Sequence, residues 1–336
     1  MYEQFYGLDA RPFDLTPDPR YLVLTKVHQE ALSNLEYAVA SRKGVTVLLG
    51  EAGTGKTTII RAAIARQPNR IYSVYLPHPA LSRVEFMEML AAQFSLSERA
   101  RTSRTDLLLE LEQLLRTRHA TEETTVLILD EAQSLPPELL EEVRLLTNIE
   151  TNSEKLLSLV LLGQPELATR LNEHSLRQLK QRIALRCDLR PLQASESVAY
   201  VARRITLAGG VPAELFTREA VVLIHEYARG IPRTINVIAD NALLGGFAAE
   251  QHTVTSQIVA DVCRDFDIPR PTVASAKNRP LQLLRPPDPL PASETRIPSP
   301  SAPATRDPHD GKVVATRDKI TNSRAPMFSA FGFRKR

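Results

Sequence analysis

The sequence is poor in cysteine and lacks any long hydrophobic run. Its two cysteines, Cys187 and Cys263, lie far apart, which argues against a disulfide framework or a cysteine metal site and fits a reducing compartment. No apolar run approaches the roughly 20 residues that a membrane-spanning helix needs. The opening MYEQFYGLDARPF lacks the basic and then apolar order of a signal peptide. These absences predict a cytoplasmic protein without a transmembrane segment.

Charge is unevenly divided along the 336 residues. The formal net charge is +3, but residues 271–336 hold twelve Lys or Arg against five Asp or Glu, so the preceding part is slightly acidic. The same segment carries eleven of the 24 prolines and little periodic apolar sequence. We therefore expect residues 269–336 to be a Pro-rich, basic, disordered tail. Its apolar and cationic end, residues 327–336, could dock on a partner or on an anionic surface, or stay unstructured.

Strand and helix patterns alternate along the first 190 residues, which is typical of an α/β protein with a parallel sheet and helices on both faces. The expected strands are 45–49, 71–76, 125–131, 156–162 and 186–189. The expected helices between them are 28–40, 57–66, 83–94, 105–118 and 137–147, followed by helical segments up to residue 183. Beyond Pro191 the strands stop, and helices are expected at 195–208, 217–228, 232–249 and 256–266. The predicted domains are an α/β domain (1–192), a helical domain (193–268) and the tail (269–336).

The most specific motif is the octapeptide GEAGTGKT at residues 50–57, which matches the phosphate-binding P-loop. It follows an apolar β-branched run and precedes a helical pattern, which is the context that the motif needs. Its glycines let backbone N–H groups turn toward phosphates at a helix N-terminus. Lys56 is expected to reach the β and γ phosphates of ATP, and Thr57 to hold Mg²⁺. The predicted nucleotide-binding residues are Gly50, Glu51, Ala52, Gly53, Thr54, Gly55, Lys56, Thr57 and Thr58.

Two acids close the third predicted strand. In an open parallel sheet, ligands sit beyond the carboxyl ends of the strands, so Asp130 and Glu131 are expected near Lys56 and Thr57. Asp130 is predicted to hold Mg²⁺ through water, and Glu131 to orient and polarise the attacking water. A strand that ends in Asp-Glu is a weak signal by itself, but it gains weight about 75 residues after a complete P-loop.

These motifs resemble the AAA+ ATPases, and within them the type of general secretion pathway protein A and the transposition helper ATPases. The resemblance covers residues 1 to about 268. It rests on an opening signature, on the two phosphate-site motifs, and on two segments further along the chain. These are residues 1–8 with 12–13 and 16–21, the P-loop at 50–57, the acid-ended strand at 126–131, LLGQPEL at 161–167, and GIPR at 230–233.

The resemblance implies further roles and a helical AAA+ lid domain. Gln164 takes the sensor 1 position, against the γ phosphate or the water, and Arg233 takes the sensor 2 position in the lid. An arginine finger, which completes a neighbouring subunit's site, is implied just before the last strand. We favour Arg182 for it over Arg177 and Arg186. A finger in trans implies a homo-oligomer with nucleotide sites at subunit interfaces.

His28 lies where the N-terminal segment of the family borders the adenine. We expect it to be a surface or capping histidine rather than a nucleotide contact. The leucine stripe at 107–115 is expected to pack into the core of the protein. Both cysteines are expected to be buried.

Two functions share this nucleotide site. The first is an AAA+ ATPase that hydrolyses ATP to drive or switch assembly of a secretion or export machine of the cell envelope or of exopolysaccharide. The second is an ATP-dependent DNA-binding helper of transposition. Relatives of the first type usually continue into a transmembrane segment and a peptidoglycan-binding part, and neither is found in this sequence. That weakens membrane integration but leaves peripheral contact through the tail. The slightly acidic folded part favours the first function.

Overall fold

The computed structural model describes residues 1–15, 23–67, 70–77 and 81–269. The chain divides into two units, residues 1–275 and 276–336, and the description concerns the first of them. The predicted tail and the signature residues 16–21 lie outside the described residues. Five strands form one parallel sheet in the order β2-β3-β4-β1-β5. Their bounds are β1 Val45–Gly50, β2 Ile71–Leu76, β3 Thr124–Leu129, β4 Leu157–Gly163 and β5 Ile183–Leu189.

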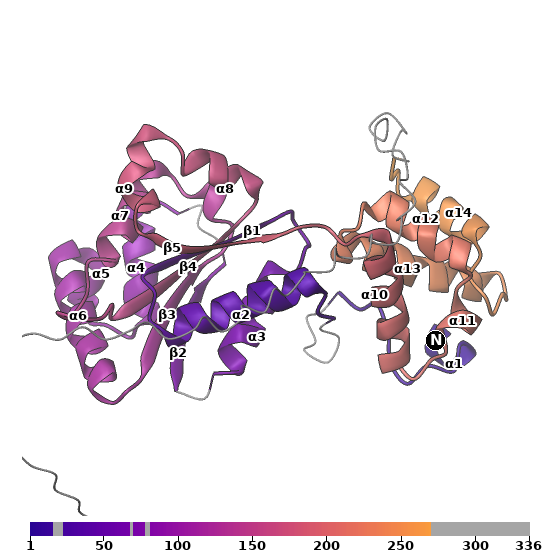
Figure 1. Ribbon diagram of the computed structural model, residues 1–336, viewed down its shortest axis with the longest axis horizontal. Coiled ribbons are helices and arrows are strands. Elements are labelled where there is room, and N and C mark those ends of the chain that lie inside the picture. The colour runs from indigo at the N-terminus through magenta and orange to yellow at the C-terminus, as the bar shows by residue number, and fades with distance from the viewer. Residues whose placement is uncertain (16–22, 68–69, 78–80, 270–336) are drawn as a thin grey trace, which may run out of the picture. The chain divides into compact units, whose positions relative to one another are not determined.

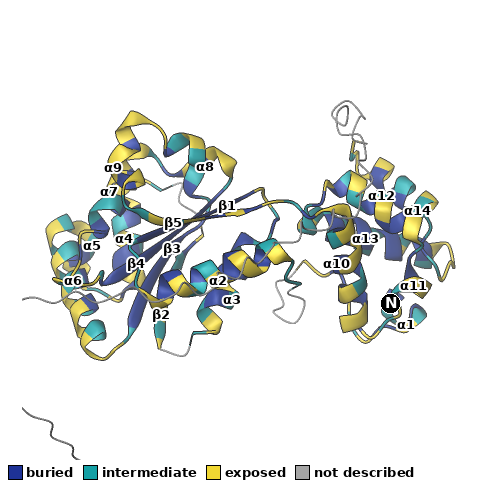
Figure 2. Ribbon diagram, in the orientation of Figure 1, coloured by how far each residue is buried: buried dark blue, intermediate teal, exposed yellow. Residues whose placement is uncertain are grey.

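The three central strands are buried along their whole length, as the dark blue of Figure 2 shows. A strand that is covered on both faces has no solvent side, so its sequence is apolar throughout. The strands at the two edges, β2 and β5, have exposed positions as well as buried ones. The continuous apolar sequences of these three strands agree with their central place in the sheet.

Helices cover both faces of the sheet, as predicted. One face packs against α2 (Lys26–Ala40) and α3 (Lys56–Ala65) through Leu48, Ile128 and Val160. The other face packs against α4 (Arg83–Gln93), α6 (Arg104–Ala120) and α7 (Pro137–Leu146). Figure 1 shows these helices beside the strands. The predicted leucine stripe lies in this second core, where Leu111 and Leu115 of α6 are almost fully buried.

A capping box opens α4, because Ser82 and Glu85 bond each other's backbone N–H groups. The short helix α5 (Glu98–Thr102), in the polar stretch that follows, was not predicted. A helix of five residues is too short to show an apolar period. It is stabilised by the Ser97 hydroxyl, which caps its N-terminus, and by the packing of Ala100. After β4 come α8 (Pro165–Arg170), the 3₁₀ turn η3 (His174–Leu176) and α9 (Arg177–Lys180).

The residues after β5 are helical, as predicted. These helices are α10 (Ala194–Leu207), α11 (Pro212–Leu215), α12 (Arg218–Ala228), α13 (Pro232–Ala248) and α14 (Ser256–Asp265). The four-residue α11 was not predicted. The helices share a separate hydrophobic core, in which Ile224, Ile235, Ala239 and Leu243 are fully buried.

The N-terminal residues belong to this helical core, which the predicted domain 1–192 did not anticipate. Tyr2 and Tyr6, in and just after α1 (Tyr2–Phe5), are buried there together with Phe13. The Tyr6 hydroxyl donates to the carbonyl of Leu243 at 3.1 Å. The first thirteen residues therefore pack against helices that lie about 200 positions later, before the chain enters α2 and the α/β part.

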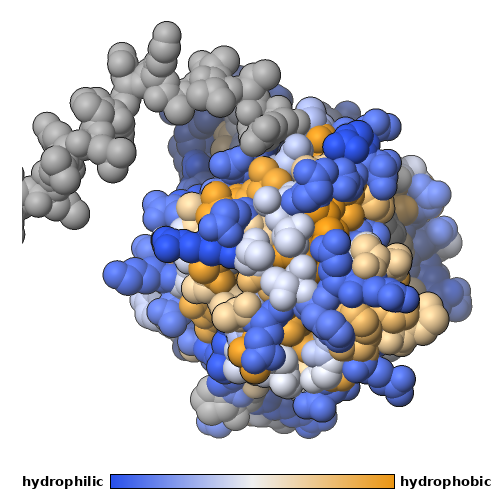
Figure 3. Space-filling model, turned by 90° about the vertical axis from the view of Figure 1, so that its right-hand side faces the viewer, coloured by the Kyte–Doolittle hydropathy of each residue, from blue (hydrophilic) through white to orange (hydrophobic). Residues whose placement is uncertain are grey.

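No described helix is long and apolar enough to cross a bilayer. Figure 3 shows one face of the protein, where hydrophobic groups reach the surface among hydrophilic ones. The exposed large apolar residues of the helical part come from different helices and loops: Val198, Leu207, Val211, Val222, Leu244 and Phe266. Both cysteines are buried and unpaired, as expected.

Candidate nucleotide site

The P-loop lies between β1 and α3, and its backbone explains two of its glycines. Gly55 is the N-cap of α3 with φ +98°, and Gly53 has φ +82°. Side chains other than glycine rarely adopt these left-handed angles. A Cβ atom on Gly53 would also lie 2.7 Å from Cβ of Arg233. The loop therefore needs glycine at both positions. Gly55 is required by the backbone conformation, and Gly53 by the backbone conformation and by the lack of space for a side chain.

Lys56 is the first residue of α3, and its side chain folds back over the loop. Its ammonium donates to the carbonyl of Gly50 at 2.8 Å and to that of Glu51 at 3.2 Å. Burial lowers the pKa of Lys56, and the nearby carboxylates of Glu131 and Asp130 oppose that shift. An ammonium has three donors, so one stays available to a phosphate oxygen.

Thr57 and Asp130 meet as the P-loop prediction required. The Thr57 hydroxyl donates to Oδ2 of Asp130 at 2.8 Å, and the Tyr75 hydroxyl donates to the same oxygen. The backbone N–H of Glu131 donates to Oδ1 at 2.8 Å. Burial and the bond to Asp130 raise the pKa of Tyr75 to about 12. Asp130 is only 6% exposed. The three donors named above fix the positions of its two carboxylate oxygens.

These oxygen donors fit Mg²⁺ rather than a softer metal. A hydroxyl and a carboxylate are hard ligands, and magnesium in nucleotide sites takes few protein ligands and completes its shell with phosphate and water. Within the described residues, no group of three His, Cys, Asp or Glu side chains is placed to hold a metal ion. Thr57 and Asp130 are therefore the residues that could hold Mg²⁺ together with a bound nucleotide.

Glu131 follows Asp130 in a left-handed backbone conformation, with φ +50° and ψ +38°. For a residue with a side chain this conformation is strained, and strain of this kind concentrates at functional sites. Two amides bind one oxygen of its carboxylate. Oε2 accepts from Nε2 of Gln133 at 2.5 Å and from Nε2 of Gln164 at 3.1 Å. Gln164, the N-cap of α8, thus contacts the predicted catalytic acid directly.

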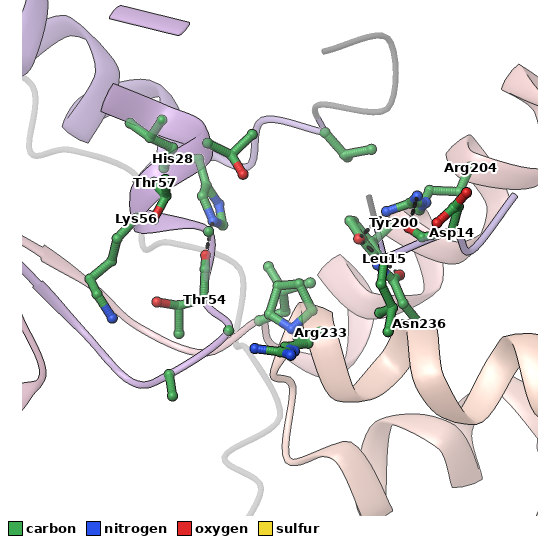
Figure 4. A pocket seen from close by; sticks show the side chains of 18 of the residues that line it. Asp14, Leu15, His28, Thr54, Lys56, Thr57, Tyr200, Arg204, Arg233 and Asn236 are labelled. Carbon is green, nitrogen blue, oxygen red and sulfur yellow. Dashed lines mark hydrogen bonds between the residues drawn. The ribbon is translucent and has the colours of Figure 1, made fainter. Parts of the chain in front are cut away.

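A cavity of about 420 Å³ opens over the P-loop. Lys56 and Thr57 line it from α3, and Arg233 lines it from the first turn of α13. Figure 4 shows these side chains around the cavity. The backbone N–H of Arg233 donates to the carbonyl of Gly53 at 3.2 Å, which ties the start of α13 to the P-loop. The predicted sensor residue therefore lies at the phosphate-binding loop.

His28 differs from its prediction, because it is buried rather than on the surface. It is 5% exposed on α2 and lines the cavity. Its Nε2 lies 3.2 Å from the carbonyl of Thr54 in the P-loop, and its Nδ1 lies 2.7 Å from the Thr25 hydroxyl. A carbonyl can only accept, so Nε2 carries the proton and Nδ1 accepts from Thr25. Burial lowers the pKa of His28, which agrees with a neutral ring.

The far end of the cavity is lined by Tyr200, Arg204 and Asn236 from the helical part, with Leu15 from the N-terminal segment. The Arg204 guanidinium donates to the Tyr200 hydroxyl at 2.8 Å, and Tyr200 donates to Oδ1 of Asn236 at 3.0 Å. Arg204 also binds the backbone carbonyls of Pro12 and Asp14. This chain of bonds fixes the N-terminal segment to α10.

The three arginines considered for a finger differ in their surroundings. Arg182 is half-buried and donates to the Thr147 hydroxyl at 2.6 Å. Arg186 is exposed and pairs with Asp188 at 2.9 Å. Arg177, at the start of α9, is exposed, and its side chain makes no hydrogen bond or ion pair with any residue that the structure describes. None of the three lines the cavity of its own subunit. Which of them acts as a finger stays a prediction.

Sequence reasoning missed Gln133, Tyr75 and Tyr200. Gln133 follows Glu131 by two residues, so its place just after the acid pair was a usable signal. Tyr75 lies on β2 and reaches Asp130 because β2 pairs with β3, in a register that sets Tyr75 opposite Ile128. That pairing joins segments about 50 residues apart. Only the fold could bring Tyr75 and Tyr200 to the site.

Three comparisons with known proteins agree with this geometry. A family model described as AAA domain matches residues 39–171. The chain is 41% identical over 256 residues to general secretion pathway protein A of Aeromonas hydrophila, across 76% of this chain and 46% of that protein. The chain thus spans less than half the length of that relative.

Solved structures share the fold at low identity. The ORC2 protein of Aeropyrum pernix, in ADPNP-ADP complexes, has a TM-score of 0.59 at 19% identity, covering 76% of this chain and 72% of that one. Drosophila ORC bound to DNA has a TM-score of 0.59 at 20% identity, covering 80% and 66%. Cdc6p from Pyrobaculum aerophilum has a TM-score of 0.55 at 15% identity, covering 76% and 70%. The family model spans the strands and helices that carry the P-loop and the acid pair, so residues 39–171 match an AAA domain and the chain is similar to general secretion pathway protein A.

Proposed function

We propose that the protein binds and hydrolyses ATP, and that it uses this cycle to drive or switch assembly of a secretion or export machine from the cytoplasmic side. One observation carries the hydrolytic part. Glu131 stands directly after the metal-binding acid and is held by two amides, beside a P-loop whose Lys56 is buried. A protein that only stored nucleotide would have no need of a carboxylate oriented in this way.

In this mechanism the residues position rather than react. Lys56 and the backbone N–H groups of the loop bind the β and γ phosphates, while Thr57 and Asp130 hold Mg²⁺. Magnesium supplies neutralisation of phosphate charge. Glu131 accepts a hydrogen bond from the attacking water and aligns it with the γ phosphorus. Gln164, just after the end of β4, donates a hydrogen bond to the carboxylate of Glu131 and so helps to hold the group that orients the water. Oriented groups of this kind lower the barrier without reorganising during the reaction.

Arg233 and Arg182 are proposed to extend the site beyond the P-loop. Arg233 contacts nucleotide phosphates from the same subunit and links nucleotide state to α13, since its backbone is bonded to Gly53. Arg182 acts in trans on a neighbouring subunit, so the active form is a homo-oligomer. The ORC2 structure in ADPNP-ADP complexes supports nucleotide binding by this fold.

The secretion role rests on similarity to general secretion pathway protein A. The alternative is an ATP-dependent DNA-binding helper, and the similarity in fold to Drosophila ORC bound to DNA supports it. The slight excess of acid in residues 1–270 favours the secretion role, because DNA binding depends on clustered Lys and Arg. Duplex binding measured with ATP at low and high salt separates the two. Binding that weakens steeply with salt favours the DNA helper, and its absence at low salt excludes it.

Nucleotide binding and turnover are tested with two substitutions. Lys56→Ala should abolish ATP binding. Glu131→Gln should keep ATP bound but lower turnover by a factor of about 100 or more, because it removes the group that orients water. Measurements of ATP affinity and steady-state phosphate release check both. Unchanged turnover in Glu131→Gln would remove the catalytic assignment of this residue.

The finger is tested by mixing inactive subunits. An oligomer of Lys56→Ala and Arg182→Ala subunits contains some sites with an intact P-loop and an intact neighbouring arginine, so some activity should return. In the matched comparison, Arg177→Ala replaces Arg182→Ala in the mixture with Lys56→Ala. Rescue with Arg177→Ala and none with Arg182→Ala would move the finger to Arg177.

A further inference from the structure

Gln133 has a side chain that is bonded at both of its polar ends. Nε2 donates to Oε2 of Glu131 at 2.5 Å, and Oε1 accepts from the backbone N–H of Gln164 at 3.0 Å. The two bonds define which end of the amide is oxygen and which is nitrogen. They also join the exit of β3, where Glu131 stands, to the exit of β4, where Gln164 begins the turn into α8.

Gln133 and Gln164 bind the same oxygen of Glu131. Both amide nitrogens reach Oε2, whereas no residue that the structure describes donates to Oε1. A carboxylate with one oxygen occupied by two donors cannot rotate freely. The free oxygen therefore has a fixed direction, and it is the one left to accept a hydrogen bond from water.

The surroundings hold Gln133 in place. Gly163, the last residue of β4, has no side chain, and a Cβ there would come within 3.2 Å of Oε1 of Gln133 and 2.6 Å of a methyl group of Leu167. The guanidinium of Arg170, at the end of α8, donates to the backbone carbonyl of Gln133. Gln164, the N-cap of α8, thus bonds the side chain of Gln133, and Arg170, the last residue of α8, bonds its backbone, so both parts of the residue are held by this element.

We propose that Gln133 is a positioning residue for ATP hydrolysis, which aims Oε1 of Glu131 at the attacking water by holding Oε2. The inference rests on the proposed function. Gln133 need not touch the nucleotide, and it is absent from the lining of the cavity. Its loss should therefore slow the chemical step and leave nucleotide affinity in place.

The test uses the full chain with Gln133→Met, which keeps the length of the side chain and removes both hydrogen bonds. We expect kcat to fall about 10- to 100-fold, the usual loss when a group that orients a catalytic ligand is removed. KM and the affinity for ATP should change by less than about twofold. Gln113→Met, at an exposed position of α6, is the matched control and should leave turnover unchanged.

A double mutant separates positioning from general loss of structure. If Gln133 acts through Glu131, adding Gln133→Met to Glu131→Gln should change the residual rate by less than about twofold. Losses that multiply, or an unchanged kcat in the single variant, would overturn the role of Gln133. The proposed function would survive in both cases. No turnover in the folded wild-type protein would overturn both.

A second variant guards against misfolding. Gln133→Glu keeps an acceptor for the N–H of Gln164 but replaces the donor to Glu131 by a like charge. It should fold, as a cooperative thermal transition would show, and still lose turnover. Wild-type turnover in this variant would count against the inference, because the bond to Glu131 is the one that it requires.

Discussion

The burial of His28 gives a prediction with a defined magnitude. His28→Leu keeps most of the volume of the side chain but removes the bonds to Thr54 and Thr25. A neutral hydrogen bond contributes about 1 kcal/mol, so the free energy of unfolding should fall by about 2 kcal/mol. Each kcal/mol moves the thermal midpoint of a domain of this size by about 2–4 °C. We expect a midpoint that is about 4–8 °C lower.

The same substitution should weaken nucleotide binding, because Thr54 belongs to the P-loop. Without the donor from His28, its carbonyl loses the contact that sets the loop against α2. If that hydrogen bond contributes about 1 kcal/mol to the binding conformation of the loop, its loss should lower ATP affinity about fivefold. His28→Gln retains an amide N–H that can reach Thr54 and should lose less affinity.

The stability of the wild type should also depend on pH through His28. Burial lowers the pKa of His28 in the folded state, whereas in the unfolded chain the ring protonates near pH 6.5. Below about pH 6.5, His28 therefore binds a proton in the unfolded chain but not in the folded state, so acidification favours unfolding. Glu196 partly opposes the lowered pKa, and Arg190 adds to it. His28→Gln does not titrate, so it should lose less stability than the wild type between pH 7.5 and 5.5.

Thermal melts across this pH range, with ATP affinity at pH 7.5, provide the assay. His225→Asn is the control, because burial also lowers the pKa of His225 but its ring bonds Ser197 in the helical part. It should alter the acid dependence and leave ATP affinity unchanged. The reasoning fails if His28→Leu melts and binds ATP like the wild type, or if His28→Gln shows the full acid loss.

Three further substitutions probe the loop, the N-terminal anchor and the core. Gly53→Ala places a strained Cβ 2.7 Å from Cβ of Arg233, so it should cost at least about 1 kcal/mol and weaken ATP binding, as melts and binding assays would show. Arg204→Met breaks buried charge-assisted bonds, and we expect a loss of about 3 kcal/mol in denaturant melts with faster proteolysis of the N-terminal segment. Leu111→Ala should cost about 2–5 kcal/mol, whereas Leu109→Ala, which is 61% exposed, should stay within about 0.5 kcal/mol. The argument about the core fails if Leu111→Ala and Leu109→Ala are equally stable. The argument about the anchor fails if Arg204→Met is as stable as the wild type, and the one about the loop fails if Gly53→Ala binds ATP as tightly as the wild type.

The phosphate side of the site was predictable because its signals are local. The P-loop, its preceding strand and the acid pair after β3 each occupy a few consecutive residues, and the rule that ligands lie beyond the carboxyl ends of parallel strands joins them. That Asp130 lies close to Thr57 follows from that rule, although their direct hydrogen bond was not predicted. The bounds of the long helices and central strands agreed to within a few residues, because their apolar periods extend over many positions.

The remaining features depend on contacts between distant segments. Nothing near His28 in the sequence shows that the P-loop covers it, and Tyr75 reaches Asp130 only through the pairing of β2 with β3. The short helices α5 and α11 are stabilised by caps and packing rather than by a period of their own. The assignment of the N-terminal residues failed for a related reason, since their apolar side chains fit either core and only the fold selects one.

The N-terminal segment gives the protein a second covalent connection between the helical core and the α/β part. The chain crosses from the helical core to the sheet once before α2 and returns once after β5. A part joined at a single point can swivel, but a part tethered at two points turns mainly about the line between them. Trimming the first thirteen residues would therefore remove packed aromatic rings and one of the two tethers, and would leave the helical part free to swivel about the other.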